Sequence, residues 1–227
     1  RSSRTVPFLS KATGYQLADI ATNVILGTSL KEQGIFDLYP PEKERCYVKA
    51  PVFSFAKLHG LDAYLSPEMK STGEAIGYDK KLSRAMYKAL QASGMKLQNY
   101  GTVLATIADR DKPEGLPLVR RFYEMGFNIE ATAGTAAYLK SFGIRTRVRG
   151  KISDGSHEIL DSIRSGYVSY IINTRSIHSS VHAQDGAAIR RCAVENGVTV
   201  FTSLDTVRVL LDVLEETTLA VSTIHAE

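Results

Sequence analysis

Over residues 101–227, short apolar runs alternate with segments whose apolar residues recur at helical spacing. Runs typical of buried strands lie at 102–108, 127–132, 144–150, 168–174 and 198–203. Helical spacing is found at 113–126, 134–143, 158–166, 186–197 and 204–216. Strands that alternate with helices favour a parallel sheet with helices on both faces. The pattern therefore predicts an α/β domain built on a five-stranded parallel sheet.

The segment at 144–150 differs from the other predicted strands in its charge. Arg145, Arg147 and Arg149 occupy every second position. Alternating charge of this kind is typical of an edge strand that leaves one face in water. We expect these arginines to be solvated and to make the local field more favourable to anions.

The first hundred residues follow a less regular pattern. Apolar residues at helical spacing predict helices at 12–27 and 79–94, each closed by a glycine. The strand-like run 46–55 contains Pro51, which favours an edge strand or a bend. Residues 66–77 contain two glycines and little periodicity, so no element is predicted there.

The change of pattern near Tyr100 predicts two domains, 1–100 of α+β character and 101–227 of α/β type. Residues 1–100 contain 14 basic and 9 acidic residues, whereas 101–227 contain 14 and 15. The basic excess thus belongs to the first domain, and no long Lys/Arg run suggests a DNA-binding surface. A phosphorylated small molecule suits this charge balance better than a polymer.

The chain has 227 residues, of which 44% are hydrophobic, enough for one large or two modest cores. Its two cysteines, Cys46 and Cys192, form no CxxC motif, so we expect a reducing cytoplasm and no disulfide framework. No apolar run approaches the roughly 20 residues that span a bilayer. The start "RSSRTVPFLSK" lacks both an apolar leader and a Met, so we expect a piece of a longer chain without a signal or transit peptide.

Polar residues follow the predicted strands of the second domain. In open α/β sheets the ligand lies outside the carboxyl ends of the strands. We therefore expect these residues to share one site: Thr106, Asp109, Asp111, Lys112, Thr132, Gly134, Thr135, Lys151, Asn173, Thr174, Thr202 and Ser203. Hydroxyls, two lysines and an amide suit a phosphate monoester, whereas no obvious acid–base couple is present among them.

The stretch "NIEATAGTAAYL" (128–139) predicts a strand that turns directly into a helix. The first N–H groups of a helix are unpaired and carry partial positive charge, which attracts phosphate. Thr132 and Thr135 are also compatible with a simple helix cap and first turn. The convergence of polar residues from several strands favours the phosphate site.

Other candidate chemistry is less specific. His178 and His182 have the spacing of a metal-binding pair, but they lie in a Ser-rich segment that we expect to be a solvated loop. Arg190 and Arg191 flank Cys192 and would lower its pKa, but that cysteine falls on the apolar stripe of a helix, which favours core packing. We predict no metal site in this chain.

Two motifs in the first domain resemble a known family. "RSSRTVPFLSKATG" and "PEMKSTGEAIG" are similar to the end of the second ATP-grasp domain of the carbamoyl-phosphate synthase large subunit. The second half resembles that family's carboxy-terminal regulatory domain, which has a methylglyoxal-synthase-like, Rossmann-type fold. The resemblance implies a cytoplasmic ligase of pyrimidine and arginine biosynthesis. Such a ligase makes carbamoyl phosphate from bicarbonate, glutamine-derived ammonia and ATP with Mg or Mn.

The resemblance also implies a glutaminase small subunit, a homo-oligomer of the complex, and UMP or a related phosphorylated effector. The residues that match the effector pocket are Thr106, Lys112, Thr132, Thr135, Lys151, Asn173 and Thr174, with Gly134 in the same turn. Arg1 and Arg4 match arginines near the ATP phosphates. The family's metal ligands precede residue 1, so we expect this chain alone to bind neither ATP nor metal and to be non-catalytic.

Two positions depart from the family pattern. Arg175 stands where a small hydroxyl residue is expected, which affects contacts to the ribose or base. Thr202 matches a residue of a second effector site, for ornithine, but the acidic partner of that site corresponds to Tyr47. Ornithine activation is therefore not expected.

Two functions remain open at this point. The first is a sensing module that binds a nucleotide and shifts a distant active site between two states. The second is an enzyme such as methylglyoxal synthase, which needs carboxylates and a histidine next to the phosphate. The sequence has no His–Asp pair after the first strand of the sheet, so it favours sensing. The charge distribution disfavours nucleic-acid binding.

Overall fold

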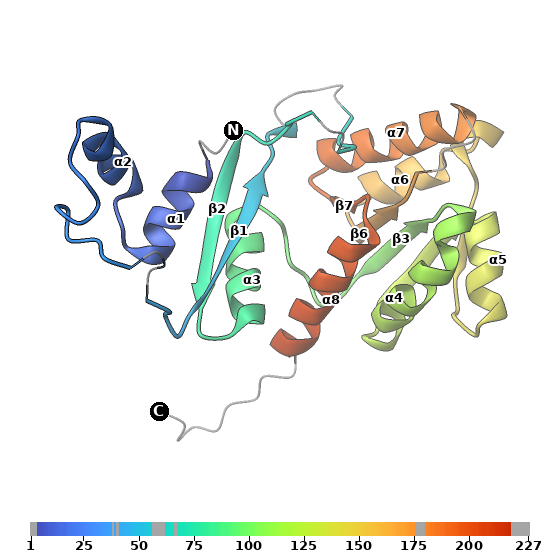
Figure 1. The fold of residues 1–227 in the computed structure, drawn as a ribbon. Coiled ribbons are helices and arrows are strands. Elements are labelled where there is room, and N and C mark those ends of the chain that lie inside the picture. Colours follow the sequence, from blue (N-terminus) through green and yellow to red (C-terminus); the bar gives the residue numbers. More distant parts are fainter. Residues whose placement is uncertain are drawn as a thin grey trace, which may run out of the picture. The chain divides into compact units, whose positions relative to one another are not determined.

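The computed structural model describes residues 4–37, 39, 41–55, 62–65, 68–175 and 180–218. The chain forms two compact units (Figure 1). Unit 1 contains residues 1–52 and 73–94, and unit 2 contains 53–72 and 95–227. Residues 53–72 and 95–100, which we expected in the first domain, thus cluster with the second unit. No helix within the described ranges is both long and apolar enough to cross a membrane.

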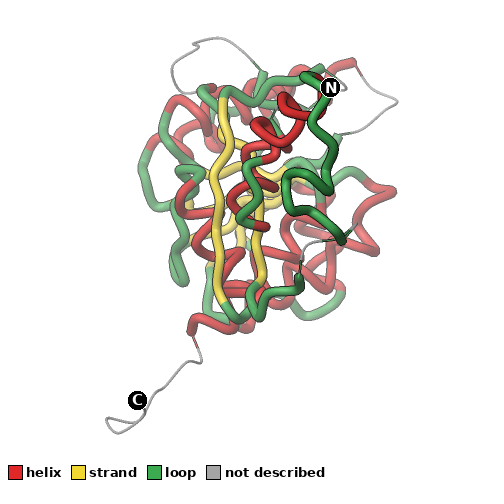
Figure 2. Tube along the Cα trace, turned by 60° about the vertical axis from the view of Figure 1, so that its left-hand side comes forward, coloured by secondary structure: helices red, strands yellow, loops and turns green. Residues whose placement is uncertain are grey.

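Unit 1 is an antiparallel strand pair with three helices. Its elements are α1 (Thr5–Thr13), α2 (Leu17–Ile25), β1 (Cys46–Val52), β2 (Gly73–Asp79) and α3 (Leu82–Ala92). The two strands run side by side, with Cys46 opposite Asp79 and Val52 opposite Gly73 (Figure 2). The helix predicted at 79–94 and the strand at 46–55 are confirmed, and the helix predicted at 12–27 is found over the shorter range of α2, because Gly14 ends α1. α1 and β2 were not predicted.

The contact between β2 and α3 depends on Gly77. A Cβ atom at this position would lie 2.5 Å from the Ala89 amide nitrogen and 2.9 Å from the Ala89 Cβ, and it would also meet the Ala85 carbonyl oxygen. Ala85 and Ala89 are the buried residues of α3. Small residues on both elements therefore allow the helix backbone to lie directly on the strand.

Unit 2 is an α/β domain, as predicted. Its five strands are all parallel, in the order β5-β4-β3-β6-β7. The strands are β3 (Thr102–Thr106), β4 (Asn128–Thr132), β5 (Arg147–Arg149), β6 (Val168–Asn173) and β7 (Thr199–Phe201). The helices are α4 (Lys112–Glu124), α5 (Ala133–Ser141), α6 (Glu158–Arg164), α7 (Ser180–Glu195) and α8 (Leu204–Thr218). Short 3-10 turns at Asp109–Asp111 and Ile152–Asp154 precede α4 and α6.

The helices cover both faces of this sheet because successive strand residues point to opposite sides. Val103 and Ala105 pack in one apolar core with residues of α4, α5 and α8. Leu104, which lies between them, packs in a second core with residues of α6 and α7. Burial on both faces explains why β3 reads as a continuous apolar run rather than an alternating one.

β5 is an edge strand, as predicted, but its arginines do not form one solvated face. Arg147 is exposed, whereas Arg149 is buried. The Arg149 guanidinium donates to both carboxylate oxygens of Glu130, at 2.8 and 2.6 Å, and to the Tyr167 hydroxyl at 2.8 Å. Hydrogen bonding to Glu130 raises the pKa of Arg149 above its ordinary value. The prediction of a solvated residue is therefore wrong for Arg149, because an acid on the neighbouring strand compensates its charge.

Candidate functional site

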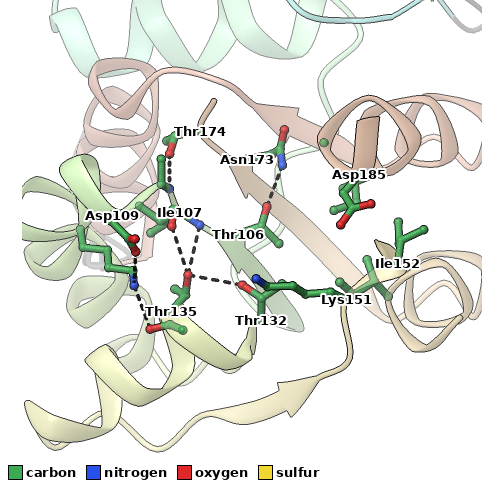
Figure 3. Close-up of a pocket in the computed structure, with 16 residues that line it drawn as sticks. Thr106, Ile107, Asp109, Thr132, Thr135, Lys151, Ile152, Asn173, Thr174 and Asp185 are labelled. Carbon is green, nitrogen blue, oxygen red and sulfur yellow. Dashed lines mark hydrogen bonds and ion pairs between the residues drawn. The ribbon is translucent and has the colours of Figure 1, made fainter. Parts of the chain in front are cut away.

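A pocket of about 160 Å³ lies at the carboxyl ends of β3, β4 and β6 (Figure 3). The residues predicted to form an effector pocket all line it: Thr106, Lys112, Thr132, Gly134, Thr135, Lys151, Asn173 and Thr174. Three of them are the last residues of their strands, and parallel strands end at one edge of the sheet. The topology therefore brings together side chains that are far apart in the sequence.

The first turn of α5 opens into this pocket without a side-chain cap. Thr132 occupies the N-cap position with extended backbone (φ −63°, ψ 154°), but its hydroxyl makes no capping hydrogen bond. It lies 3.5 Å from the Thr135 hydroxyl instead. The interpretation of Thr132 as a simple cap is thus not supported, and the leading amides of α5 remain available to an anion.

Thr135 has a structural role inside the pocket wall. Its side chain is buried, and its hydroxyl accepts a hydrogen bond from the Ile107 amide and donates to the Ile107 carbonyl, both at 3.3 Å. These contacts join the beginning of α5 to the end of β3. They fix the position of the helix start relative to the neighbouring strand.

Two lysines face the pocket from different elements. The Lys112 ammonium donates to the Gly134 carbonyl at 2.9 Å and pairs with Asp109 at 2.6 Å. Lys151 follows β5, is half-buried, and extends across the pocket toward Thr132 (Figure 3). Within the described part of the chain, no carboxylate forms an ion pair with Lys151. Its positive charge is therefore directed at the same space as the α5 amides.

Asn173 forms the buried floor of the pocket together with Thr106. The Asn173 amide group donates to the Thr106 hydroxyl at 2.8 Å, and that hydroxyl donates to the Ile172 carbonyl at 3.3 Å. Beside them, the Thr174 hydroxyl accepts from the Ala108 amide at 2.8 Å. Each of these polar groups has a hydrogen-bond partner, so the floor is an organised network of paired groups.

Two carboxylates also line the pocket, Asp109 from the expected set and Asp185, which was not predicted. Asp109 pairs with Lys112 and is 95% exposed. Asp185, on α7, accepts a hydrogen bond from the Ser153 amide at 3.2 Å. Sequence analysis missed Asp185 because the helix was expected to begin at residue 186, whereas α7 begins at Ser180. Among the residues described, no three His, Cys, Asp or Glu side chains cluster as a metal site would require.

The remaining candidates lie elsewhere or outside the described residues. Thr202 directly follows β7 and is not among the residues that line this pocket. Arg175 is exposed, with its guanidinium 5.1 Å from the centre of the Tyr64 ring. Arg4 precedes α1 in unit 1, whereas Arg1 lies outside the described residues. Tyr47 stacks on Tyr78 across the β1–β2 pair.

The prediction that the Ser-rich segment with His178 and His182 is a loop is wrong in part. The backbone of His182 belongs to α7, so the Ser-rich segment is not a loop along its whole length. His178 and the side chain of His182 lie outside the described residues. The structure therefore provides no support for pairing them around a metal.

Cys192 is a core residue, as favoured by its place on the apolar stripe. It is 6% exposed, and burial raises the pKa of its thiol above the ordinary value. A raised pKa lowers the thiolate fraction at any given pH, and the thiolate is the reactive form. We expect a disulfide reagent such as DTNB at pH 8 to modify the half-buried Cys46 first and Cys192 only after unfolding, as measured by mass spectrometry. Equal rates in the folded protein would contradict this assignment.

Comparison with known families agrees with the architecture of unit 2. Residues 114–202 match the model of the MGS-like domain family. The match runs from the first turn of α4 to the residue after β7, and it includes the pocket residues from Thr132 to Thr174. The expectation of an MGS-like domain is therefore confirmed, and this domain type is consistent with the regulatory domain of carbamoyl-phosphate synthase.

Proposed function

We propose that the pocket of unit 2 binds a phosphorylated effector, such as UMP, without altering it chemically. The main support is the uncapped start of α5 facing the ammonium of Lys151, a combination that suits a phosphate dianion. Thr106, Asn173 and Thr174 provide hydroxyl and amide groups for the rest of the ligand. A small dianion held in this way would be sensed rather than turned over.

We further propose that the chain is a carboxy-terminal part of the large subunit of a cytoplasmic, glutamine-dependent carbamoyl-phosphate synthase. The resemblance of "RSSRTVPFLSKATG" and "PEMKSTGEAIG" to that family supports this proposal. On this basis the parent enzyme would use ATP with Mg or Mn, pair with a glutaminase subunit and form oligomers. Unit 1 would then be the end of an ATP-grasp domain, with Arg4 near the nucleotide phosphates.

The effector site can be tested by calorimetric titration of the protein with UMP. Lys151→Ala and Thr132→Ala should each weaken binding by about 1–3 kcal/mol, because each removes a contact to a charged phosphate oxygen. Lys140→Ala is a matched control, since it removes an exposed ammonium in the last turn of the same helix, α5. Neither pocket variant should unfold the domain, which circular dichroism can check.

Two results would contradict the proposed site, and a third would exclude UMP as its ligand. Unchanged affinity in both pocket variants would mean that UMP binds elsewhere. An equal loss in Lys140→Ala would mean that the overall charge of the domain, rather than the pocket, attracts the nucleotide. Absence of UMP binding to the unmodified protein would exclude UMP as the effector.

A second candidate function is methylglyoxal-synthase-like catalysis on a small phosphate ester. The observation in its favour is that Asp109 and Asp185 both line the pocket, because such chemistry needs carboxylates beside the phosphate. Incubation with dihydroxyacetone phosphate distinguishes the two functions. We expect no methylglyoxal above background; product that disappears in Asp185→Asn would establish the enzyme instead.

A further inference from the structure

One buried arginine connects the floor of the pocket to the segment between β1 and β2. Arg190, on α7, donates from Nη1 to the Asn173 side-chain carbonyl at 2.6 Å. Its Nε and Nη2 atoms donate to the two carboxylate oxygens of Asp62, both at 2.6 Å. The Arg190 side chain is only 5% exposed, and its guanidinium lies 5.3 Å from the centre of the Tyr64 ring.

This arrangement determines which way the Asn173 amide points. A guanidinium only donates hydrogen bonds, so the amide must present its oxygen to Arg190 and its NH₂ group to Thr106. Gly186, one turn before Arg190 on α7, leaves room for the contact. A Cβ atom there would lie 3.0 Å from Arg190 Nη1 and 3.3 Å from the Asn173 oxygen.

The same guanidinium attaches residues 62–65 to α7 within unit 2. Asp62 uses both of its oxygens on Arg190, and Oδ1 also accepts from the Tyr64 amide at 3.0 Å. Hydrogen bonding from Arg190 lowers the pKa of Asp62, so the carboxylate is ionised at neutral pH. The Lys70 ammonium donates to the Tyr64 carbonyl at 2.6 Å, a local contact within the same segment.

We propose that Arg190 is a positioning residue that couples occupation of the pocket to the docking of residues 62–65. The inference rests on the proposed effector site and specifies how that site is regulated. A ligand that requires the Asn173 orientation seen here favours the Asp62–Arg190 contact, and by thermodynamic reciprocity that contact favours the ligand. Because residues 53–72 join β1 to β2 along the chain, occupation of the pocket biases a segment covalently continuous with unit 1.

The test measures UMP affinity in Asp62→Asn. This position is suitable because Asp62 is not among the described residues that line the pocket. We expect affinity to fall about tenfold, within the usual range of coupling between sites. Arg190→Lys, which keeps the charge but loses the bidentate contact, should weaken binding similarly. Glu215→Gln is the control, because it breaks an ion pair with Arg121 between α4 and α8, away from the pocket.

A measurement on the unmodified chain covers the case in which a variant fails to fold. UMP should slow hydrogen exchange at the Tyr64 amide, which is bonded to Asp62, and this slowing should be absent in Asp62→Asn. The coupling is overturned if the unmodified protein binds UMP, hydrogen exchange at the Tyr64 amide does not slow, and Asp62→Asn binds UMP equally well. In that case the effector site itself stands. If the unmodified protein binds neither UMP nor inorganic phosphate, the effector site fails, and the coupling fails with it.

Discussion

Replacing Glu130 with alanine is expected to lower the free energy of unfolding of unit 2 by about 3–5 kcal/mol. Glu130 and Arg149 form a buried bidentate ion pair between β4 and β5, with side chains 4% and 10% exposed. Removal of the acid would leave the guanidinium buried without a compensating charge. The Tyr167 hydroxyl, which also contacts Arg149, cannot replace a carboxylate.

Chemical denaturation followed by circular dichroism measures this loss. The control is Glu114→Ala, which breaks an ion pair with Arg208 whose side chains are 54% and 48% exposed. Exposed pairs contribute about 0–1 kcal/mol, so this variant should remain close to the unmodified protein. Similar losses in the two variants would show that burial does not distinguish the Glu130 pair.

Replacing Gly77 with alanine is expected to destabilise unit 1 by about 3 kcal/mol, at the upper end of the range for overpacking. The added methyl group would meet backbone atoms of Ala85 and Ala89, and backbone cannot move aside as a flexible side chain can. β2 and α3 would have to separate. Hydrogen exchange of the α3 amides reports this change within unit 1 without assuming that the two units unfold together.

Gly73→Ala is a matched control on the same strand. A Cβ atom at Gly73 would lie 3.7 Å from the Val52 Cβ, which is an ordinary contact. Because alanine also restricts the unfolded chain more than glycine does, this variant should be neutral or slightly stabilising. Equal effects at the two positions would mean that the contact between β2 and α3 does not depend on Gly77.

The elements of unit 2 could be predicted because the central strands β3, β4 and β6 are largely buried on both faces and the helices pack one apolar face on the sheet. This regularity leaves a clear pattern in the apolar residues. The candidate pocket could be predicted for the same reason, since a parallel sheet brings strand ends together without any need to know the strand order. Thr106, Thr132 and Asn173 were found in this way.

Features that depend on pairs distant in the sequence could not be predicted. Arg149 resembled a solvated residue because its acid lies on another strand, and the partner of Arg190 is 128 positions away. β2 was missed because Gly73 and Gly77 are typical of loops, although Gly77 is there to admit a helix. Such contacts between elements cannot be predicted from the composition of the sequence around each residue.

The path of the chain between its units limits how the α/β half could be transplanted. The polypeptide leaves unit 1 after Val52, returns at Gly73 and leaves again after Gly94. A cassette cut at Met95 would lack Asp62 and Tyr64, so Arg190 would lose both its carboxylate partner and the aromatic ring beside its guanidinium. The α/β half is therefore not self-contained, and any exchange of it between proteins must include residues 53–72 as well.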